Sequence, residues 1–343
     1  MSQPLFRRVL GVDQTGAALA GGRRARPLPA VLLEMPSSGE SGWAKQVELP
    51  DLTRESVLSL LSSPSDPEGS QGAIILDGVL GLPETLRTGE ESGSGYLWQQ
   101  FFRAAQTQGQ DGRRYGRALG EKFFSEIWSG PTSLMPTRTC ERWARANSVF
   151  QLHPFQKNIQ TGTFRLWREL GQAGKPWIHI WPQDRAQVGE SGPWLFEGYP
   201  SLLWRELLGL PTRDLSKLPA QVERVLAERP LSLRIAPDLT QALARSPDLA
   251  DAFVLALGGA LLQLDPALWL PLDPRSIEGR AAAYEGWIAG LRRDASASPS
   301  PRPDSTERST SVRPSAAAKA SPAKKSPGAA SSQGASRAPR TRE

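Results

Sequence analysis

Acidic side chains stand at the ends of several apolar runs in this chain of 343 residues. Asp13, Asp77 and Glu197 each close a short run rich in β-forming residues, which is typical of a strand buried in a sheet. Ligands of α/β sheets bind at the carboxyl ends of strands, so we expect these acids to share one edge. A turn would explain Asp13 alone, because an Asp before Thr-Gly can bond its own backbone. The repeated placement favours a common site.

Two further acids, Asp248 and Asp251, lie three residues apart near the start of an apolar helix predicted at 248–262. This spacing puts both on one helix face, although acids also favour first turns through the helix dipole. Neighbouring carboxylates repel one another unless cations neutralise them, and oxygen ligands suit Mg²⁺ or Mn²⁺. Two such ions could activate water and stabilise the leaving oxygen in phosphodiester cleavage. We therefore predict a site for two Mg²⁺ or Mn²⁺ ions.

Basic residues that could contact substrate phosphates lie between these acids in the sequence. Arg138 and Arg142 fall near one face of a helix predicted at 137–147, and Lys157 follows before the next helix. Such side chains commonly bind phosphate oxygens, although a solvated helix face would use the same residues. Other chemistries find little support, because His153 and His179 have no Cys or His partner at metal-ligand spacing. Cys140 has no base near it in the sequence.

The elements that must position these residues alternate between strands and helices. Three strands joined by short turns predict an antiparallel meander, at 9–12, 29–35 and 45–49. Further strands are predicted at 73–76, 177–181 and 194–196. Apolar periodicity predicts helices at 54–61, 96–128, 161–170, 202–208, 220–227 and 248–262, and 276–291 is the last ordered element. This order indicates an α/β domain.

The charge of the chain is unevenly distributed. Residues 294–343 contain nine Lys or Arg and four Asp or Glu, so this segment carries +5 of the net charge of +6. It is rich in Ser, Pro and Ala and has no aromatic residue, which predicts a disordered tail. The remaining body, 1–293, is almost neutral, which argues against one large nucleic-acid-binding surface.

The cysteine content and hydropathy indicate the compartment. A single cysteine excludes an internal disulfide and suits a reducing environment. The longest apolar run, 252–262, is too short to span a bilayer, and no signal segment opens the chain. We expect a soluble cytoplasmic protein that does not bind membranes.

Six short motifs carry a resemblance to a known family. They are Gly11-Val12-Asp13, Leu76-Asp77 with Gly81-Leu82-Pro83, Arg138 to Glu141, Glu197-Gly198-Tyr199-Pro200, Asp248-Leu249-Ala250-Asp251-Ala252 and Glu285-Gly286-Trp287-Ile288. With these motifs in this order, the body of the chain resembles a family of unknown function predicted to be ribonuclease-H-like nucleases. Two positions depart from the family pattern, since Gly78-Val79 follows Asp77 where Ala-Pro is usual, and Gln14 replaces a small residue.

The resemblance implies a ribonuclease-H-like domain over 1–293, with a mixed five-stranded sheet flanked by helices and a helical insertion at roughly 84–150. It implies a metal-dependent nuclease that hydrolyses RNA or DNA. Asp13 and Asp77 would bind the metals, and Asp251 would complete the site. Glu197 would be a further ligand, or an acid that contacts the ligands without binding the metals. Asp251 followed by Ala252 fits the family motif better than Asp248, which is the alternative ligand on the helix.

Two other functions stay open. An actin-like ATPase or sugar kinase on the same superfold would carry a Gly-rich phosphate hairpin, which Asp13-Gln14-Thr15-Gly16 resembles faintly. It should also carry a late Gly-Gly motif, and here Gly258-Gly259 lies inside an apolar helix. A non-catalytic binding protein that kept the fold would fit the near-neutral body.

Overall fold

The computed structural model describes residues 6–14, 26–35, 41–86, 93–106, 136–146, 148, 157–184, 190–229, 231–265, 273 and 275–291. The chain divides into two compact units, Met1–Pro299 and Ser300–Glu343. The second unit and the predicted tail at 294–343 lie outside the described residues, as does much of the predicted insertion at 84–150. All of the elements below belong to the first unit.

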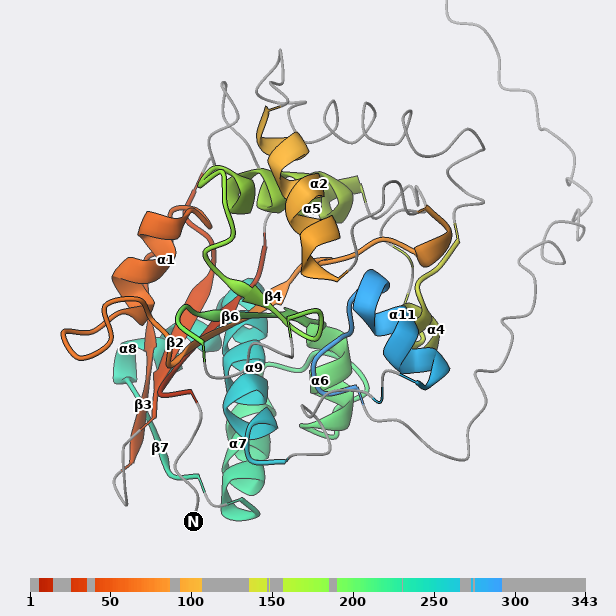
Figure 1. Ribbon diagram of the computed structural model, residues 1–343. Coiled ribbons are helices and arrows are strands. Elements are labelled where there is room, and N and C mark those ends of the chain that lie inside the picture. The colour runs from red at the N-terminus through yellow and green to blue at the C-terminus, as the bar shows by residue number, and fades with distance from the viewer. Residues whose placement is uncertain are drawn as a thin grey trace, which may run out of the picture. The chain divides into compact units, whose positions relative to one another are not determined.

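A seven-stranded mixed sheet forms the centre of this unit, in the order β5-β6-β4-β1-β2-β3-β7 (Figure 1). The strands are β1 (Arg8–Val12), β2 (Ala30–Glu34), β3 (Gly42–Gln46), β4 (Gly72–Asp77), β5 (His179–Ile180), β6 (Trp194–Gly198) and β7 (Leu233–Ile235). β2 runs antiparallel to β1 and to β3, and the other neighbouring pairs are parallel. The predicted α/β class, mixed sheet and meander are therefore confirmed.

The prediction of five strands is wrong. The three-residue strand β7 extends the sheet beyond β3, and the two-residue strand β5 extends it beyond β6. The strand predicted at 177–181 is present as β5, although it is shorter than predicted. The sequence does not predict β7, because three partly exposed residues bury little apolar surface and show no clear alternation. β3 also begins at Gly42 instead of residue 45, since its pairing with β2 sets the register.

Helices cover both faces of the sheet (Figure 1). Their bounds are α1 (Arg54–Leu61), the 3-10 helix η2 (Glu84–Leu86), α2 (Ser94–Gln106), α4 (Thr139–Ala144), α5 (Lys157–Gly171), α6 (Pro200–Glu206), α7 (Leu218–Ala227), α8 (Pro237–Leu243), α9 (Pro247–Leu262) and α11 (Ile277–Glu285). Within the described ranges, no helix has the length and apolar character needed to cross a membrane.

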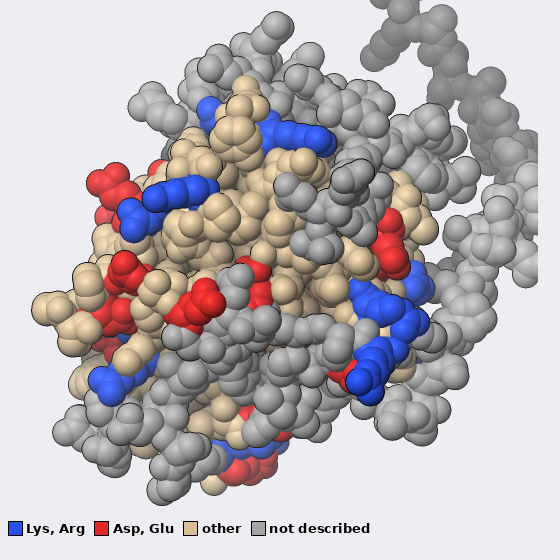
Figure 2. Space-filling model, in the orientation of Figure 1, with Lys and Arg blue, Asp and Glu red and all other residues tan. Residues whose placement is uncertain are grey.

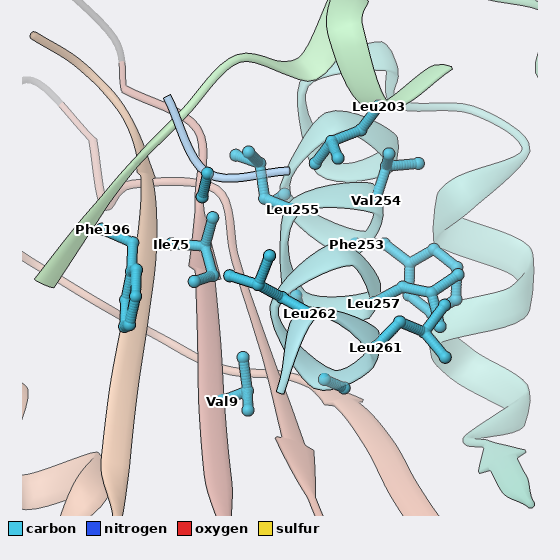
Figure 3. Packing of buried hydrophobic residues seen from close by; sticks show 14 of the residues in the cluster. Val9, Ile75, Phe196, Leu203, Phe253, Val254, Leu255, Leu257, Leu261 and Leu262 are labelled. Carbon is cyan, nitrogen blue, oxygen red and sulfur yellow. The ribbon is translucent and has the colours of Figure 1, made fainter. Parts of the chain in front are cut away.

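Alternation along the strands sends side chains into two separate apolar clusters. Leu10 and Ile74 join the cluster that α1, α2 and α5 complete. Val9 and Ile75 point to the other face, where they pack on α9 (Figure 3). Phe196 belongs to the same cluster and contacts the rings of Phe6, Trp181 and Trp194. Successive residues of a strand face opposite sides, so the face of every later strand residue follows from this pattern. The helix α9 therefore defines one face of the sheet.

Contact between β1 and α9 is close because Gly11 has no side chain. A Cβ atom at this position would lie 2.0 Å from the carbonyl oxygen of Ala252 and 2.4 Å from the backbone nitrogen of Ala256. A second glycine, Gly259, lets α9 approach Ile75, since a Cβ there would lie 2.4 Å from Cγ1 of that residue. The missing side chains bring the first turns of α9 against the end of β1.

Adding a methyl group at Gly11 should separate β1 from α9. We expect Gly11→Ala to lower the free energy of unfolding by at least about 3 kcal/mol, the upper end of the usual cost of overpacking, because the clash is with backbone atoms. Urea denaturation would measure this change. The control is Gly78→Ala, whose Cβ would have nearest neighbours at 3.5 Å; it should change stability by no more than about 1 kcal/mol. Similar stabilities for the two variants would contradict this description of the contact.

Candidate metal centre

Two aspartates meet at the carboxyl ends of β1 and β4. These strands are parallel, and Val12 pairs with Leu76, so the next residues, Asp13 and Asp77, lie side by side. Alternation directs both side chains to the face that α9 covers, the same face as Gly11 and Ile75. The two carboxyl groups are close enough to share a hydrogen bond, which raises the pKa of Asp13 and lowers that of Asp77. This contact requires one of them to hold a proton, because two ionised carboxylates can only accept.

A third carboxylate reaches the pair from α9. Asp251 lies one turn into this helix and is buried. The indole nitrogen of Trp204, on α6, donates to its Oδ1 at 2.7 Å, and Nη2 of Arg213 donates to its Oδ2. The position of Asp251 follows from the start of α9, where Ser246 accepts a hydrogen bond from Leu249 and Pro247 begins the helix.

A fourth carboxylate, Asp248, lies at the rim of the group. Its side chain is 44% exposed and is 3.6 Å from Nη2 of Arg26. We call Asp13, Asp77, Asp248 and Asp251 the carboxylate cluster. Two arginines therefore stand beside this cluster, Arg26 next to Asp248 and Arg213 next to Asp251.

Burial makes Asp13, Asp77 and Asp251 hard to ionise. Burial raises the pKa of Asp13 from 3.8 to about 9, and the charges of Asp77, Asp251 and Asp248 add to this effect. Burial and the charge of Asp251 raise the pKa of Asp77 to about 7. Burial also raises the pKa of Asp251 to about 6, against the lowering effects of Trp204 and Arg213. Near neutral pH the cluster keeps protons that a bound cation would replace.

The donor set of the cluster fits Mg²⁺ or Mn²⁺, since it consists of carboxylate oxygens. In the present side-chain arrangement, however, no three His, Cys, Asp or Glu residues among those described are placed to hold a metal ion together. The contacts of Asp251 account for this, because its two oxygens face Trp204 and Arg213. A metal ion would be held by the Asp13–Asp77 pair and would need Asp251 to exchange a partner.

Glu197 does not join the carboxylate cluster. It precedes Gly198 on β6, and alternation directs it to the same face as Leu195, away from α9. Its two oxygens accept hydrogen bonds from Nη1 and Nη2 of Arg138, at 2.7 and 2.5 Å. The amide of Leu80 donates to the same carboxylate at 3.0 Å. Its charge still reaches Asp77, where it raises the pKa.

Arg138 is buried and holds three parts of the chain together. Besides Glu197, it donates from Nε to Glu141 at 3.0 Å and from Nη1 to the carbonyl oxygen of Glu285 at 2.9 Å. The Glu285 side chain in turn accepts from the amides of Glu84 and Thr139. We call Arg138, Glu141, Glu197 and Glu285 the arginine network. It brings together motifs that are far apart in the sequence, and it directs the Arg138 guanidinium to the protein interior.

The other predicted residues lie outside both groups. Arg142 donates to the carbonyl oxygen of Thr137 and to the hydroxyl of Thr139, near the surface. Lys157 begins α5, and its side chain is outside the described part of the structure. Burial raises the pKa of the Cys140 thiol, consistent with the predicted inert role.

Two residues of the site have no clear signal in the sequence. Trp204 and Arg213 lie in and after α6, far from the motifs, and each reaches Asp251 through folding. Alternation shows from the sequence that Phe196 and Glu197 face opposite sides of a strand. It does not show which of these sides is covered by α9, so the separation of Glu197 from the aspartates required the structure.

Removing the charge of Asp13 should stabilise the metal-free protein. Because its pKa is raised from 3.8 to about 9, the folded state binds a proton that the unfolded state releases in this range. Stability contributed by this group is therefore complete below pH about 4 and falls as the pH rises toward 9. We expect Asp13→Asn to raise the free energy of unfolding at pH 8 by about 1–3 kcal/mol, with no gain at pH 4.

Urea denaturation in the presence of a chelator would measure this effect at both pH values. The control is Asp238→Asn, an exposed aspartate in the first turn of α8, which should give no gain. A loss of stability in Asp13→Asn at pH 8 would show that the carboxyl group of Asp13 is not strained by burial.

Removing the cation of the arginine network should have the opposite effect. Arg138→Met leaves Glu197 and Glu141 buried without a counter-ion, so we expect a loss of about 3–5 kcal/mol. The double variant Arg138→Met with Glu197→Gln should recover part of this loss. Arg142→Met, on the same helix, is the matched control and should cost less than about 1 kcal/mol. If Arg138→Met were as stable as that control, Arg138 would not be the counter-ion of the network.

Comparisons with protein-family models, with curated proteins and with solved structures each found no match for this chain. The function of the carboxylate cluster must therefore be inferred from its own chemistry. That chemistry is a group of buried acids, assembled from two parallel strands and one helix, on a scaffold that contains a second group of acids held by a buried arginine and by backbone amides.

Proposed function

We propose that this chain is a metal-dependent phosphodiesterase or nuclease of the ribonuclease-H-like type. The observation that carries the proposal is the carboxylate cluster, in which burial raises the pKa of Asp13, Asp77 and Asp251. The charge of Asp251 raises the pKa of both strand-end aspartates further. Structural carboxylates are normally paired with a base or with hydrogen-bond donors. Perturbed acids grouped at the carboxyl ends of parallel strands are instead typical of functional sites.

The order and connections of the strands support a ribonuclease-H-like fold. An antiparallel meander of β1, β2 and β3 is followed by α1 and then by β4, which is parallel to β1. Acids lie at the ends of the first and fourth strands and on a late helix, as expected for a ribonuclease-H-like nuclease. β5 and β7 would then be additions at the two edges of the sheet.

Each carboxylate would have its own part in holding Mg²⁺ or Mn²⁺. Asp13 and Asp77 already touch, so they would bind the ion between them, and Asp251 would complete the ligand set. Asp248 is the more exposed alternative on the same helix. A bound divalent ion would supply activation of water and neutralisation of the leaving oxygen. The protein holds the ligands in place and excludes bulk water through the packing of α9 on β1.

The proposed partner is nucleic acid. We expect it to bind mainly through contacts near the carboxylate cluster and not through a wide basic surface. On the face shown in Figure 2, the described Lys and Arg side chains form separate groups with uncharged residues between them. Non-specific binding to nucleic acid rests on many phosphate contacts, which such a surface does not favour. A few cations close to the reacting phosphate fit this surface better, and Arg26 and Arg213 lie beside the cluster.

The structure does not favour the ATPase or kinase alternative. Gly259 packs against Val9 and Ile75, where a Cβ would lie 2.8 and 2.4 Å from their side-chain atoms. Gly259 therefore serves the contact between α9 and the sheet, and Gly258 faces Leu203 of α6, where a Cβ would lie 2.8 Å from Cδ1. The close approach of Gly11 to the backbone of α9 is a packing role of the same kind.

Calorimetric titration with Mn²⁺ and a cleavage assay would test the proposal together. We expect the wild-type protein to bind Mn²⁺ and to hydrolyse bis(p-nitrophenyl) phosphate or a structured nucleic acid when Mn²⁺ or Mg²⁺ is added. Asp13→Asn should fold, bind Mn²⁺ at least about 10-fold more weakly and lose the activity, since a ligand is removed. Asp238→Asn should behave as the wild type. The stoichiometry of the titration distinguishes one ion from the predicted two.

Two results would contradict the proposal. Equal activity of the wild type and Asp13→Asn would assign the cleavage to a contaminant or another site. Absence of Mn²⁺ binding and of cleavage in the wild-type protein would favour a non-catalytic binding protein on this fold.

A further inference from the structure

Arg213 occupies a position that the proposed metal function must alter. It lies in the loop between α6 and α7, and its Nη2 donates to Oδ2 of Asp251. The Asp251 side chain is 3% exposed, whereas that of Arg213 is 42% exposed. The ion pair therefore has one buried and one partly exposed member, and the guanidinium lies between Asp251 and solvent.

Arg213 supplies the cluster with a positive charge, as a bound metal ion would. The positive charge of Arg213 favours ionisation of Asp77 as well as of Asp251, so it acts on two of the three buried acids. A divalent cation bound to Asp13 and Asp77 would supply this charge and would repel the guanidinium. A divalent cation that also took Asp251 as a ligand would compete with Arg213 for Oδ2, the oxygen to which Arg213 donates.

Trp204, which binds the other oxygen of Asp251, allows Oδ2 to change its partner while the carboxylate keeps its orientation. Trp204 holds Oδ1 of Asp251 at 2.7 Å, and its indole is buried. The carboxylate can therefore keep its orientation when Oδ2 changes its partner. Among the described residues, Asp251 is the one carboxylate that forms an ion pair with Arg213, so a displaced guanidinium has no competing acid there.

We propose that Arg213 is the internal counter-cation of the metal-free cluster, that a divalent ion displaces it from Asp251, and that the displaced guanidinium binds a phosphate oxygen of the substrate. This inference rests on the proposed function. Arginine suits the role, because its planar group binds carboxylates and phosphates with the same paired N–H donors. Its partial exposure leaves room for a phosphodiester at the outer side of the cluster.

The test compares Mn²⁺ binding by calorimetry in four proteins. In Arg213→Gln the competing cation is removed, so we expect the dissociation constant for Mn²⁺ to fall by about 3–10-fold, within the usual range of couplings between charged sites. Arg213→Lys keeps the charge and should bind Mn²⁺ like the wild type. The matched control is Arg205→Gln, since Arg205 has a similar exposure of 41% and pairs with Glu206 outside the cluster; it should also match the wild type.

A second measurement tests the contact with substrate. At saturating Mn²⁺, Arg213→Gln should raise the KM for bis(p-nitrophenyl) phosphate by about 10-fold, the usual loss for one charge-assisted hydrogen bond. Arg205→Gln should leave the KM unchanged. Tighter Mn²⁺ binding together with an unchanged KM would overturn the substrate contact.

The outcomes separate this inference from the function on which it rests. Tighter Mn²⁺ binding by Arg213→Gln, or binding by that variant alone, supports displacement. Equal or weaker binding by Arg213→Gln, with a wild type that binds Mn²⁺, overturns the role of Arg213 and leaves the metal site standing. Absence of Mn²⁺ binding in all four proteins overturns the proposed function and this inference with it.

Discussion

The contact between β1 and α9 at Gly11 is the constraint on which the rest of the structure depends. The missing side chain lets the backbone of α9 lie directly against the strand, at Ala252 and Ala256. This approach places the start of α9 beside the end of β1, so that Asp251 reaches the aspartates on the strand ends. It also buries Val9 and Ile75 under the apolar residues of the helix (Figure 3). Core packing and the position of the candidate site thus have one cause.

The protein treats buried charge in two different ways on the two sides of β4 and β6. In the arginine network, Arg138 supplies a cation to Glu197 and Glu141, and nearby amides satisfy other oxygens. The carboxylate cluster contains three buried or partly buried acids, and Arg213 touches one of them from the surface. The first group resembles a structural ion-pair network. In the second, burial raises the pKa of Asp13 and Asp77, and the proposed ligand of positive charge would offset this cost to stability.

The sequence predicts much of this arrangement, because long or strongly apolar elements carry clear periodicity. The ends of β1 and β4, the helices α1 and α9, and the meander follow from local pattern and turn residues. The adjacency of Asp13 and Asp77 follows from parallel strands once the fold class is known. The strand β7 is too short to show a period, and the partners of Arg138 and Arg213 are set by tertiary contacts between distant segments. Such pairings depend on which face of a strand meets which helix, and the local pattern does not contain that information.

The most direct test of the account is the position of Mn²⁺ in a crystal of this protein, located by its anomalous scattering. The account predicts a peak between the carboxylates of Asp13 and Asp77, with Asp251 turned toward it and its bond to Arg213 broken. A crystal at saturating Mn²⁺ that shows no peak at these residues, with the ion pair of Arg213 and Asp251 intact, would contradict the assignment of the cluster as a metal centre.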